Sequence, residues 1–229
     1  MAAPHPAEAF AGHTFDGILF DLDGTLIDSR IALERAWGRW AAEERIDLFQ
    51  LQGSHGMPAA EIVARLLPAP RVEAALARIV RYEETDTDGV VARPGSHEAL
   101  AALPHGTAAL VTSCTRVLAA ARAGAARLTL PSAVVTFDDV TRGKPAPDPF
   151  LAGAAALGLD PSRCLVVEDA PAGLTGARAA GCATLAVDGT HHLDELDADA
   201  AVPDLSHLRF EAGPGGVRLL AAAASATRG

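Results

Sequence analysis

The stretch ILFDLDGT, residues 18–25, decides the fold that we expect for this chain. Its apolar residues run without in-out alternation, which predicts a strand covered on both faces in a parallel sheet. Asp21 and Asp23 follow the strand, spaced so that both side chains can face one point, and Gly24 permits a sharp turn after them. Two carboxylates this close repel each other unless a cation compensates their charge.

Further short apolar runs predict strands that alternate with helices. Helices are expected at 115–125, 148–157 and 171–180, the last starting at Pro171, a residue suited to a first helical turn. This alternation predicts an α/β fold, with a doubly wound, mostly parallel sheet and a Rossmann-like core. The strand runs are 17–21, 107–112, 133–137, 163–169 and 182–187.

The segment 28–93 interrupts this rhythm because it shows helical patterns and no convincing strand run. We therefore expect an inserted all-helical cap domain at 28–93, with the catalytic core formed by 1–27 and 94–229. The Arg and Glu residues between 61 and 84 are expected on an exposed face of the cap.

The two ends of the chain carry weaker patterns. The first dozen residues predict a loose extension, and the segment beyond 203 predicts a Gly-Pro turn, a short helix and a frayed end. Within the cap, Trp37 and Trp40 are expected to pack between helices.

Composition limits the possible partners. The chain has 229 residues, a net charge of -10 and scattered Arg residues, so we expect no nucleic-acid partner. No apolar run is long enough to span a bilayer and no secretion signal is apparent, which predicts a cytoplasmic protein without a membrane partner. Three cysteines without a CxxC pair fit a reducing compartment. A monomer is expected, with a dimer as the alternative.

Polar side chains follow the predicted strands at their carboxyl ends, where ligands of such sheets bind. Thr112 and Ser113 end the second strand, and Glu168 and Asp169 end a later one. We expect them to converge with the two carboxylates of the opening stretch. Oxygen ligands of this kind suit Mg²⁺, which shares its coordination with a substrate phosphate.

The positive charge that a phosphate site requires is predicted at Lys144, in the turn RGKPAPDP ahead of a helix. Its ammonium can neutralise an attacking carboxylate and a phosphate oxygen together. The hydroxyl of Thr112 or Ser113, with the N–H groups of the helix start that follows, would hold the remaining phosphate oxygens. The sequence leaves open which hydroxyl makes the main contact.

The spacing of residues in these motifs does not fit three other kinds of functional site. In DLDG and DTDG the Gly stands fourth and not sixth, which excludes an EF-hand loop. GKP lacks the Ser or Thr and the earlier Gly of a P-loop. A cysteine phosphatase needs an Arg in the same loop, and Arg116 and Arg122 are unsuitably spaced, so Cys114 is expected to lend its backbone N–H.

The motifs FDLDGTLIDS, LVTSCTR, GKPAPDPF and VVEDAPAG, in this order, resemble the four motifs of the haloacid dehalogenase-like hydrolase superfamily over roughly residues 15–190. The insertion is similar to the helical cap of that superfamily. The resemblance implies that Asp21 is the nucleophile of an aspartyl-phosphate mechanism and that Asp23 is the general acid and base. It also implies Mg²⁺ held by Asp21, the main-chain carbonyl of Asp23, and Asp169, with Glu168 close by or acting through water.

Within the superfamily the chain looks like the sugar-phosphate and polyol-phosphate phosphatases, on the basis of SHG in the cap, DTDGVVARPG at the second hinge and VTSCTR. This implies a phosphoric monoester hydrolase acting on a small-molecule phosphate ester that His55 and Gly56 contact from the cap. Met57 and Pro58 stand where relatives often carry Arg, so a basic contact to the distal part of the substrate is expected to be missing.

Two alternatives remain beside the phosphatase. A hexose-phosphate mutase of the same fold would carry a His four residues after Ser29, where this chain has Leu33. A non-catalytic binding scaffold would have a degenerate core, whereas all four motifs here keep chemically competent side chains.

Overall fold

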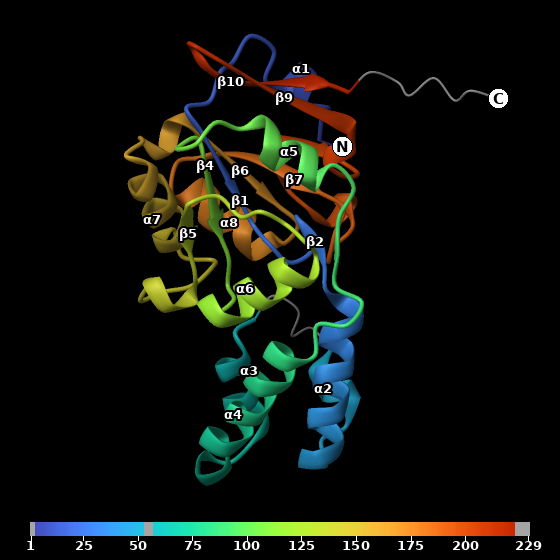
Figure 1. The fold of residues 1–229 in the computed structure, drawn as a ribbon. Coiled ribbons are helices and arrows are strands. Elements are labelled where there is room, and N and C mark those ends of the chain that lie inside the picture. The colour runs from blue at the N-terminus through green and yellow to red at the C-terminus, as the bar shows by residue number, and fades with distance from the viewer. Residues whose placement is uncertain (1–2, 53–56, 223–229) are drawn as a thin grey trace, which may run out of the picture.

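The computed structural model describes residues 3–52 and 57–222, and its centre is a parallel sheet (Figure 1). The six strands lie in the order β5-β4-β1-β6-β7-β8. The predicted α/β class and parallel sheet are confirmed, and β8 is a further strand that the sequence did not predict. The strands are β1 (Gly17–Phe20), β4 (Ala108–Val111), β5 (Ala133–Val135), β6 (Cys164–Glu168), β7 (Ala183–Val187) and β8 (Ala200–Val202).

Helices cover both faces of this sheet because successive strand residues point to opposite sides. Ile18 and Phe20 of β1 belong to one buried cluster, and Leu19 belongs to the other. Residues of α5 and α6 pack into the first cluster, and residues of α7 and α8 pack into the second. These helices are α5 (Ser96–Ala102), α6 (Arg116–Ala125), α7 (Asp148–Leu157) and α8 (Pro171–Ala179).

The segment between β1 and α5 forms a separate helical part, which lies below the sheet in the view of Figure 1. It has its own buried cluster, in which the rings of Trp37 and Trp40 meet edge to face with centroids 5.2 Å apart. The indole N–H of Trp40 donates to the carbonyl of Ala75 at 2.9 Å. The helices are α2 (Arg30–Glu44), α3 (Ala59–Leu66) and α4 (Ala69–Thr85), with a 3-10 turn, η1 (Leu48–Leu51), between α2 and α3.

Two very short strands join the ends of this helical part. β2 (Ile27–Asp28) and β3 (Val91–Ala92) pair antiparallel, with Ile27 opposite Ala92 and Asp28 opposite Val91. The sequence predicted the ends of the insertion here, at 28 and 93, but no strands. The chain therefore enters and leaves the helical part through adjacent points.

The prediction of a short helix is wrong for residues 208–221, which form a β-hairpin, and the predicted frayed end lies outside the described residues. Val217 and Leu219 are buried while Arg218 between them is exposed, which is the alternation of a strand with one buried face. Phe210 packs edge to face against Phe20 of the sheet, with ring centroids 5.9 Å apart. The strands are β9 (Leu208–Gly213) and β10 (Gly216–Ala221).

Residues 3–10 pack against the core and do not form the predicted loose extension. A short helix, α1 (Pro6–Ala9), buries Pro6, and the N–H of Ala201 donates to the carbonyl of Pro4 at 3.1 Å. This contact ties the N-terminal residues to the edge strand β8.

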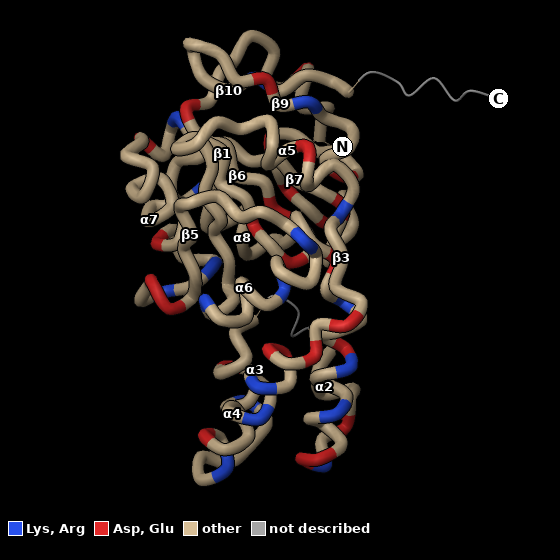
Figure 2. Tube along the Cα trace, in the orientation of Figure 1, with Lys and Arg blue, Asp and Glu red and all other residues tan. Residues whose placement is uncertain are grey.

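Charged residues of both signs are interspersed along the core and the helical part (Figure 2). Arg35 of α2 and Asp86 after α4, for example, form an exposed ion pair at 2.5 Å. In the described part of the chain, no helix combines the length and the apolarity needed to cross a bilayer.

Candidate active site

A cavity of about 830 Å³ lies where the carboxyl ends of β1, β4 and β6 face the helical part. Because parallel strands end at the same edge of a sheet, residues far apart in the chain meet here. His55 and Gly56, predicted as substrate contacts, lie outside the described residues. The other predicted site residues all line the cavity: Asp21, Asp23, Gly24, Thr112, Ser113, Cys114, Lys144, Glu168 and Asp169.

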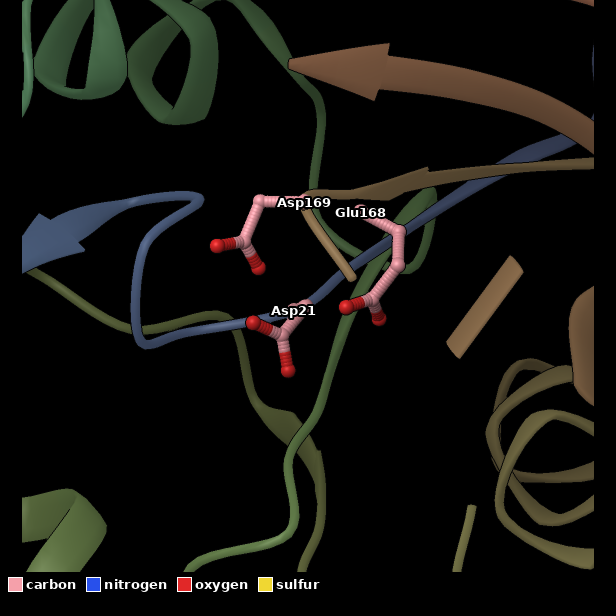
Figure 3. A group of neighbouring side chains, drawn as sticks. All are labelled: Asp21, Glu168 and Asp169. Atoms are coloured by element: carbon pink, nitrogen blue, oxygen red, sulfur yellow. The ribbon is translucent and has the colours of Figure 1, made fainter. Parts of the chain in front are cut away.

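Three buried carboxylates, Asp21, Glu168 and Asp169, gather at one place (Figure 3), where one oxygen from each lies within 4.8 Å of the other two. Burial, together with the neighbouring carboxylates, raises the pKa of Asp21 to about 6 and that of Glu168 to about 8. Burial also raises the pKa of Asp169, whose Oδ2 accepts the N–H of Thr190 at 2.5 Å. Oxygen donors gathered in this way fit a hard divalent cation.

Lys144 supplies the positive charge beside this cluster, from the turn before α7. Its Nζ donates to Oδ1 of Asp21 at 2.5 Å and to Oε2 of Glu168 at 2.8 Å. Burial acts to lower the pKa of Lys144, but the charges of its two carboxylate partners outweigh burial and raise it above its usual range. The ammonium is therefore held in its charged form next to the Asp21 carboxylate.

Two glycines allow the carboxylates to lie against the backbone. Gly24 has a φ of +84°, and a Cβ built there would collide with the carboxylate of Asp169. A Cβ on Gly173, in α8, would collide with the carboxylate of Glu168. The sequence predicted the need for glycine at Gly24. The need for a residue without a side chain at Gly173 was not predicted, because it depends on how α8 packs over β6.

Asp23 is held by three donors from different parts of the chain. Its Oδ1 accepts the hydroxyl of Ser29 at 2.6 Å and Nη1 of Arg122 at 2.9 Å, and its Oδ2 accepts the thiol of Cys114 at 2.9 Å. Burial raises the pKa of Cys114 well above its usual range, so the thiol stays protonated and acts as a donor. The N–H of Cys114 donates to the hydroxyl oxygen of Thr112 at 3.1 Å.

From the sequence, Arg122 was considered only as a partner for Cys114. The contact of Arg122 with Asp23 was not predicted. Arg122 is buried on α6, and its Nη2 lies 3.3 Å from Oε1 of Glu83 on α4. The expectation that the charged residues of 61–84 are exposed is wrong for Glu83, which is only 7% exposed and whose pKa is raised by burial.

A signal for this pair does exist in the sequence, because each residue occupies the buried stripe of its helix. Arg122 lies on the same side of α6 as the buried residues Leu118, Ala119 and Ala123. Glu83 lies on the buried side of α4 with Ala75, Ile79 and Tyr82. A charged residue at such a position requires a partner in the protein.

The cavity wall formed by the helical part is largely apolar, in contrast to the core side. Met57, which was singled out from the sequence in the cap loop, is part of this wall. Other members of the wall are Leu33, Trp37, Leu51, Leu76 and Val80.

Comparison with known proteins places these features in context. Residues 15–181 match the family model described as haloacid dehalogenase-like hydrolase. Hexitol phosphatase A of Escherichia coli (strain K12) is 43% identical over 198 residues, covering 79% of this chain and 88% of that protein. Validoxylamine A 7'-phosphate phosphatase of Streptomyces hygroscopicus subsp. limoneus is 34% identical over 202 residues, covering 84% and 95%. The crystal structure of a hydrolase from Pseudomonas syringae matches with a TM-score of 0.73 at 26% identity, covering 85% of this chain and 95% of that one.

Proposed function

Because the chain belongs to the haloacid dehalogenase-like hydrolases, we propose that it is a phosphoric monoester hydrolase acting on a small phosphorylated sugar or polyol. The observation that carries this proposal is the buried Lys144 ammonium beside Asp21, in a cavity that Asp23 also lines. The substrate class is supported by the relatives, one named a hexitol phosphatase and another a phosphatase of a validoxylamine phosphate.

The proposed reaction has two displacements at phosphorus. In the first, a carboxylate oxygen of Asp21 forms a bond to phosphorus while the ester P–O bond breaks, and Asp23 donates a proton to the leaving alcohol oxygen. In the second, Asp23 takes a proton from water as the water oxygen attacks phosphorus. The bond to Asp21 then breaks, and the carboxylate is regenerated with release of inorganic phosphate. One water is consumed for each ester cleaved.

The residues around Asp21 would hold the phosphate during both steps. The Lys144 ammonium stabilises negative charge on Asp21 and on a phosphate oxygen. The Thr112 hydroxyl, whose oxygen already accepts the N–H of Cys114, keeps its own hydrogen for a phosphate oxygen. Ser113, which is half-buried in the cavity wall, is placed to contact a second oxygen.

We assign the metal site to Asp21, Asp169 and the main-chain carbonyl of Asp23, with Glu168 close by, and propose Mg²⁺ as the ion. The fit rests on the three buried carboxylates, one oxygen from each of which lies within 4.8 Å of the other two. Bound there, Mg²⁺ supplies the positive charge that makes the approach of an anionic nucleophile to an anionic phosphate favourable.

In this proposal residues 28–93 act as a cap over a core of 1–27 and 94–229, excluding water during attack on phosphorus. Substrate contacts from His55 and Gly56, a monomeric state and a cytoplasmic location remain predictions. A mutase is disfavoured because the residue four positions after Ser29 is Leu33, which lines the cavity and cannot transfer a proton.

The experiment is a phosphate-release screen with Mg²⁺ over hexitol, hexose and glycerol phosphates. We expect turnover by the wild type and a loss of roughly 10³-fold or more for Asp21→Asn, which removes the nucleophile. Asp16→Asn is the matched control, since Asp16 pairs with Arg163 at the surface. Near-normal turnover by Asp21→Asn would refute the assignment. Isomerisation of hexose phosphates without phosphate release would identify a mutase, and inactivity over the whole panel would favour a scaffold.

A further inference from the structure

An ion triad with two buried members, Arg122 and Glu83, connects the helical part to the predicted general acid, Asp23, which is partly exposed. Arg122 is at its centre, with Nη1 2.9 Å from Oδ1 of Asp23 and Nη2 3.3 Å from Oε1 of Glu83. Asp23 follows β1 in the core, while Glu83 belongs to α4, which packs against α6. One guanidinium therefore bridges the core and the helical part.

The burial of Arg122 and Glu83 makes the geometry of their ion pair demanding. The side chains of Arg122 and Glu83 are only 5% and 7% exposed, so neither can exchange its partner for bulk water. Removing one member of such a pair leaves an uncompensated buried charge, which is strongly unfavourable. The planar fork of Arg122 presents two separate nitrogens, Nη1 to Asp23 and Nη2 to Glu83, in a fixed geometry, whereas the compact ammonium of Lys does not hold two partners at these separated positions. The position of α4 and the direction of the guanidinium are thereby linked.

The other two donors to Asp23 are not themselves ion-paired with α4, although α2, which follows Ser29, packs against α4. Ser29 precedes α2, and Cys114 follows β4 in the core. Each donates one hydrogen bond to a different oxygen of Asp23, at 2.6 Å and 2.9 Å. Among the described residues that contact the Asp23 carboxylate, Arg122 is the one that is also paired with α4.

We propose that Arg122 is a positioning residue that couples the orientation of the Asp23 carboxylate to the docking of α4, through its ion pair with Glu83. This inference rests on the proposed function, because it assigns Asp23 the proton transfer to the leaving alcohol. When α4 is docked, Glu83 fixes one side of the guanidinium and the other side fixes Asp23. When α4 moves away, Arg122 loses this restraint, and Asp23 loses its alignment with the leaving oxygen. Proton transfer is thus favoured when the cavity is covered.

The test uses leaving groups that differ in their need for a proton. The alcohol of a hexitol phosphate must be protonated as it leaves, whereas p-nitrophenolate is stable as an anion. We expect Glu83→Gln to lower kcat for the hexitol phosphate roughly 10- to 100-fold, a part of the 10²- to 10⁴-fold that a positioned acid contributes. KM should change less than about threefold, and the first-turnover release of p-nitrophenolate should keep its wild-type rate. Arg122→Lys should give the same pattern.

The control is Arg78→Gln, which lies on the same helix but pairs with Glu44 inside the helical part. It should leave both substrates unaffected, provided that thermal unfolding shows all variants to be folded. An equal loss of first-turnover rate with both substrates would overturn the proposal, as would an increase in KM alone, because the pair would then only dock the helix. Unchanged kinetics in both Glu83→Gln and Arg122→Lys would overturn it too. Failure of the proposed function is distinguishable, since the wild type itself would then release no phosphate from either substrate.

Discussion

Replacing Lys144 with Met should destabilise the metal-free protein strongly. The lysine side chain is 5% exposed and makes ion pairs of 2.5 Å and 2.8 Å with Asp21 and Glu168, which are themselves buried. Breaking a buried pair by removing one partner costs about 3–5 kcal/mol, because the remaining charge has no compensation. At about 2–4 °C per kcal/mol for a chain of this size, the expected fall in Tm is roughly 6–20 °C.

The loss of stability caused by Lys144→Met should depend on pH in a defined direction. The pKa of Asp21 is already raised to about 6 and that of Glu168 to about 8, and removal of the ammonium raises both further. The folded state then holds protons that the unfolded state releases, so stability falls as pH rises through this window. The destabilisation by Lys144→Met should therefore be small near pH 5 and large near pH 8, by roughly 2 kcal/mol or more.

The assay is thermal unfolding in EDTA, comparing wild type, Lys144→Met and the control Arg142→Met at both pH values. Arg142 lies in the same turn, but its side chain is 69% exposed and pairs with Asp148 at the surface, so its loss should cost at most about 1 kcal/mol. A loss for Lys144→Met that is equal at both pH values would show that packing, and not charge, explains it. A loss no larger than that of Arg142→Met would refute the reasoning altogether.

Two further predictions concern the metal and the hairpin. Mg²⁺ should raise the Tm of the wild type relative to EDTA, by the equivalent of about 2.7 kcal/mol at a concentration 100 times its Kd. The variant Asp169→Asn should lose most of this gain. An equal gain in the variant would place the ion elsewhere. Phe210→Ala should cost about 3–5 kcal/mol in thermal unfolding because it empties a buried ring site against Phe20, whereas Arg218→Ala should cost less than about 0.5 kcal/mol. A Phe210→Ala variant as stable as Arg218→Ala would show that the hairpin is not part of the core.

The central strands could be predicted because burial on both faces leaves a continuous apolar run. β1 and β6 are buried at every position, and their limits agree with the predicted runs to within one residue. β8 has only three residues, and β2 and β3 have two each, so too few side chains exist to establish a pattern. Such short strands form because tertiary packing brings partners alongside them.

Local propensity could not predict whether the C-terminal segment forms a helix or a strand. An Ala-rich stretch after a Gly-Pro turn favours a helix when it is considered alone. The deciding contribution comes from Val217 and Leu219, which are buried as β10 pairs with β9, and from the hydrogen bonds between Val217 and Phe15. Phe15 is distant from Val217 in the chain, so the effect of this pairing becomes visible only in the folded structure.

The candidate site, too, could be predicted only in part from the sequence. Residues that end strands, such as Asp21 and Asp169, could be brought together from the sequence because parallel strands share one edge. The contact between Arg122 and Glu83 could not, since it joins residues 39 positions apart through the packing of α6 on α4. Their positions on buried helical stripes reveal that each needs a partner but do not identify it.

The pairing of β2 with β3 has an implication for how proteins of this architecture diversify. Because the helical part leaves and rejoins the core through two adjacent residues on each side, it can be exchanged for another segment without changing the register of the sheet. A chimera that joins a foreign segment at Asp28 and Val91 should keep its reaction centre and acquire new selectivity. Such an exchange would have to preserve an acidic residue opposite Arg122, which makes Glu83 the point where the graft and its host must match.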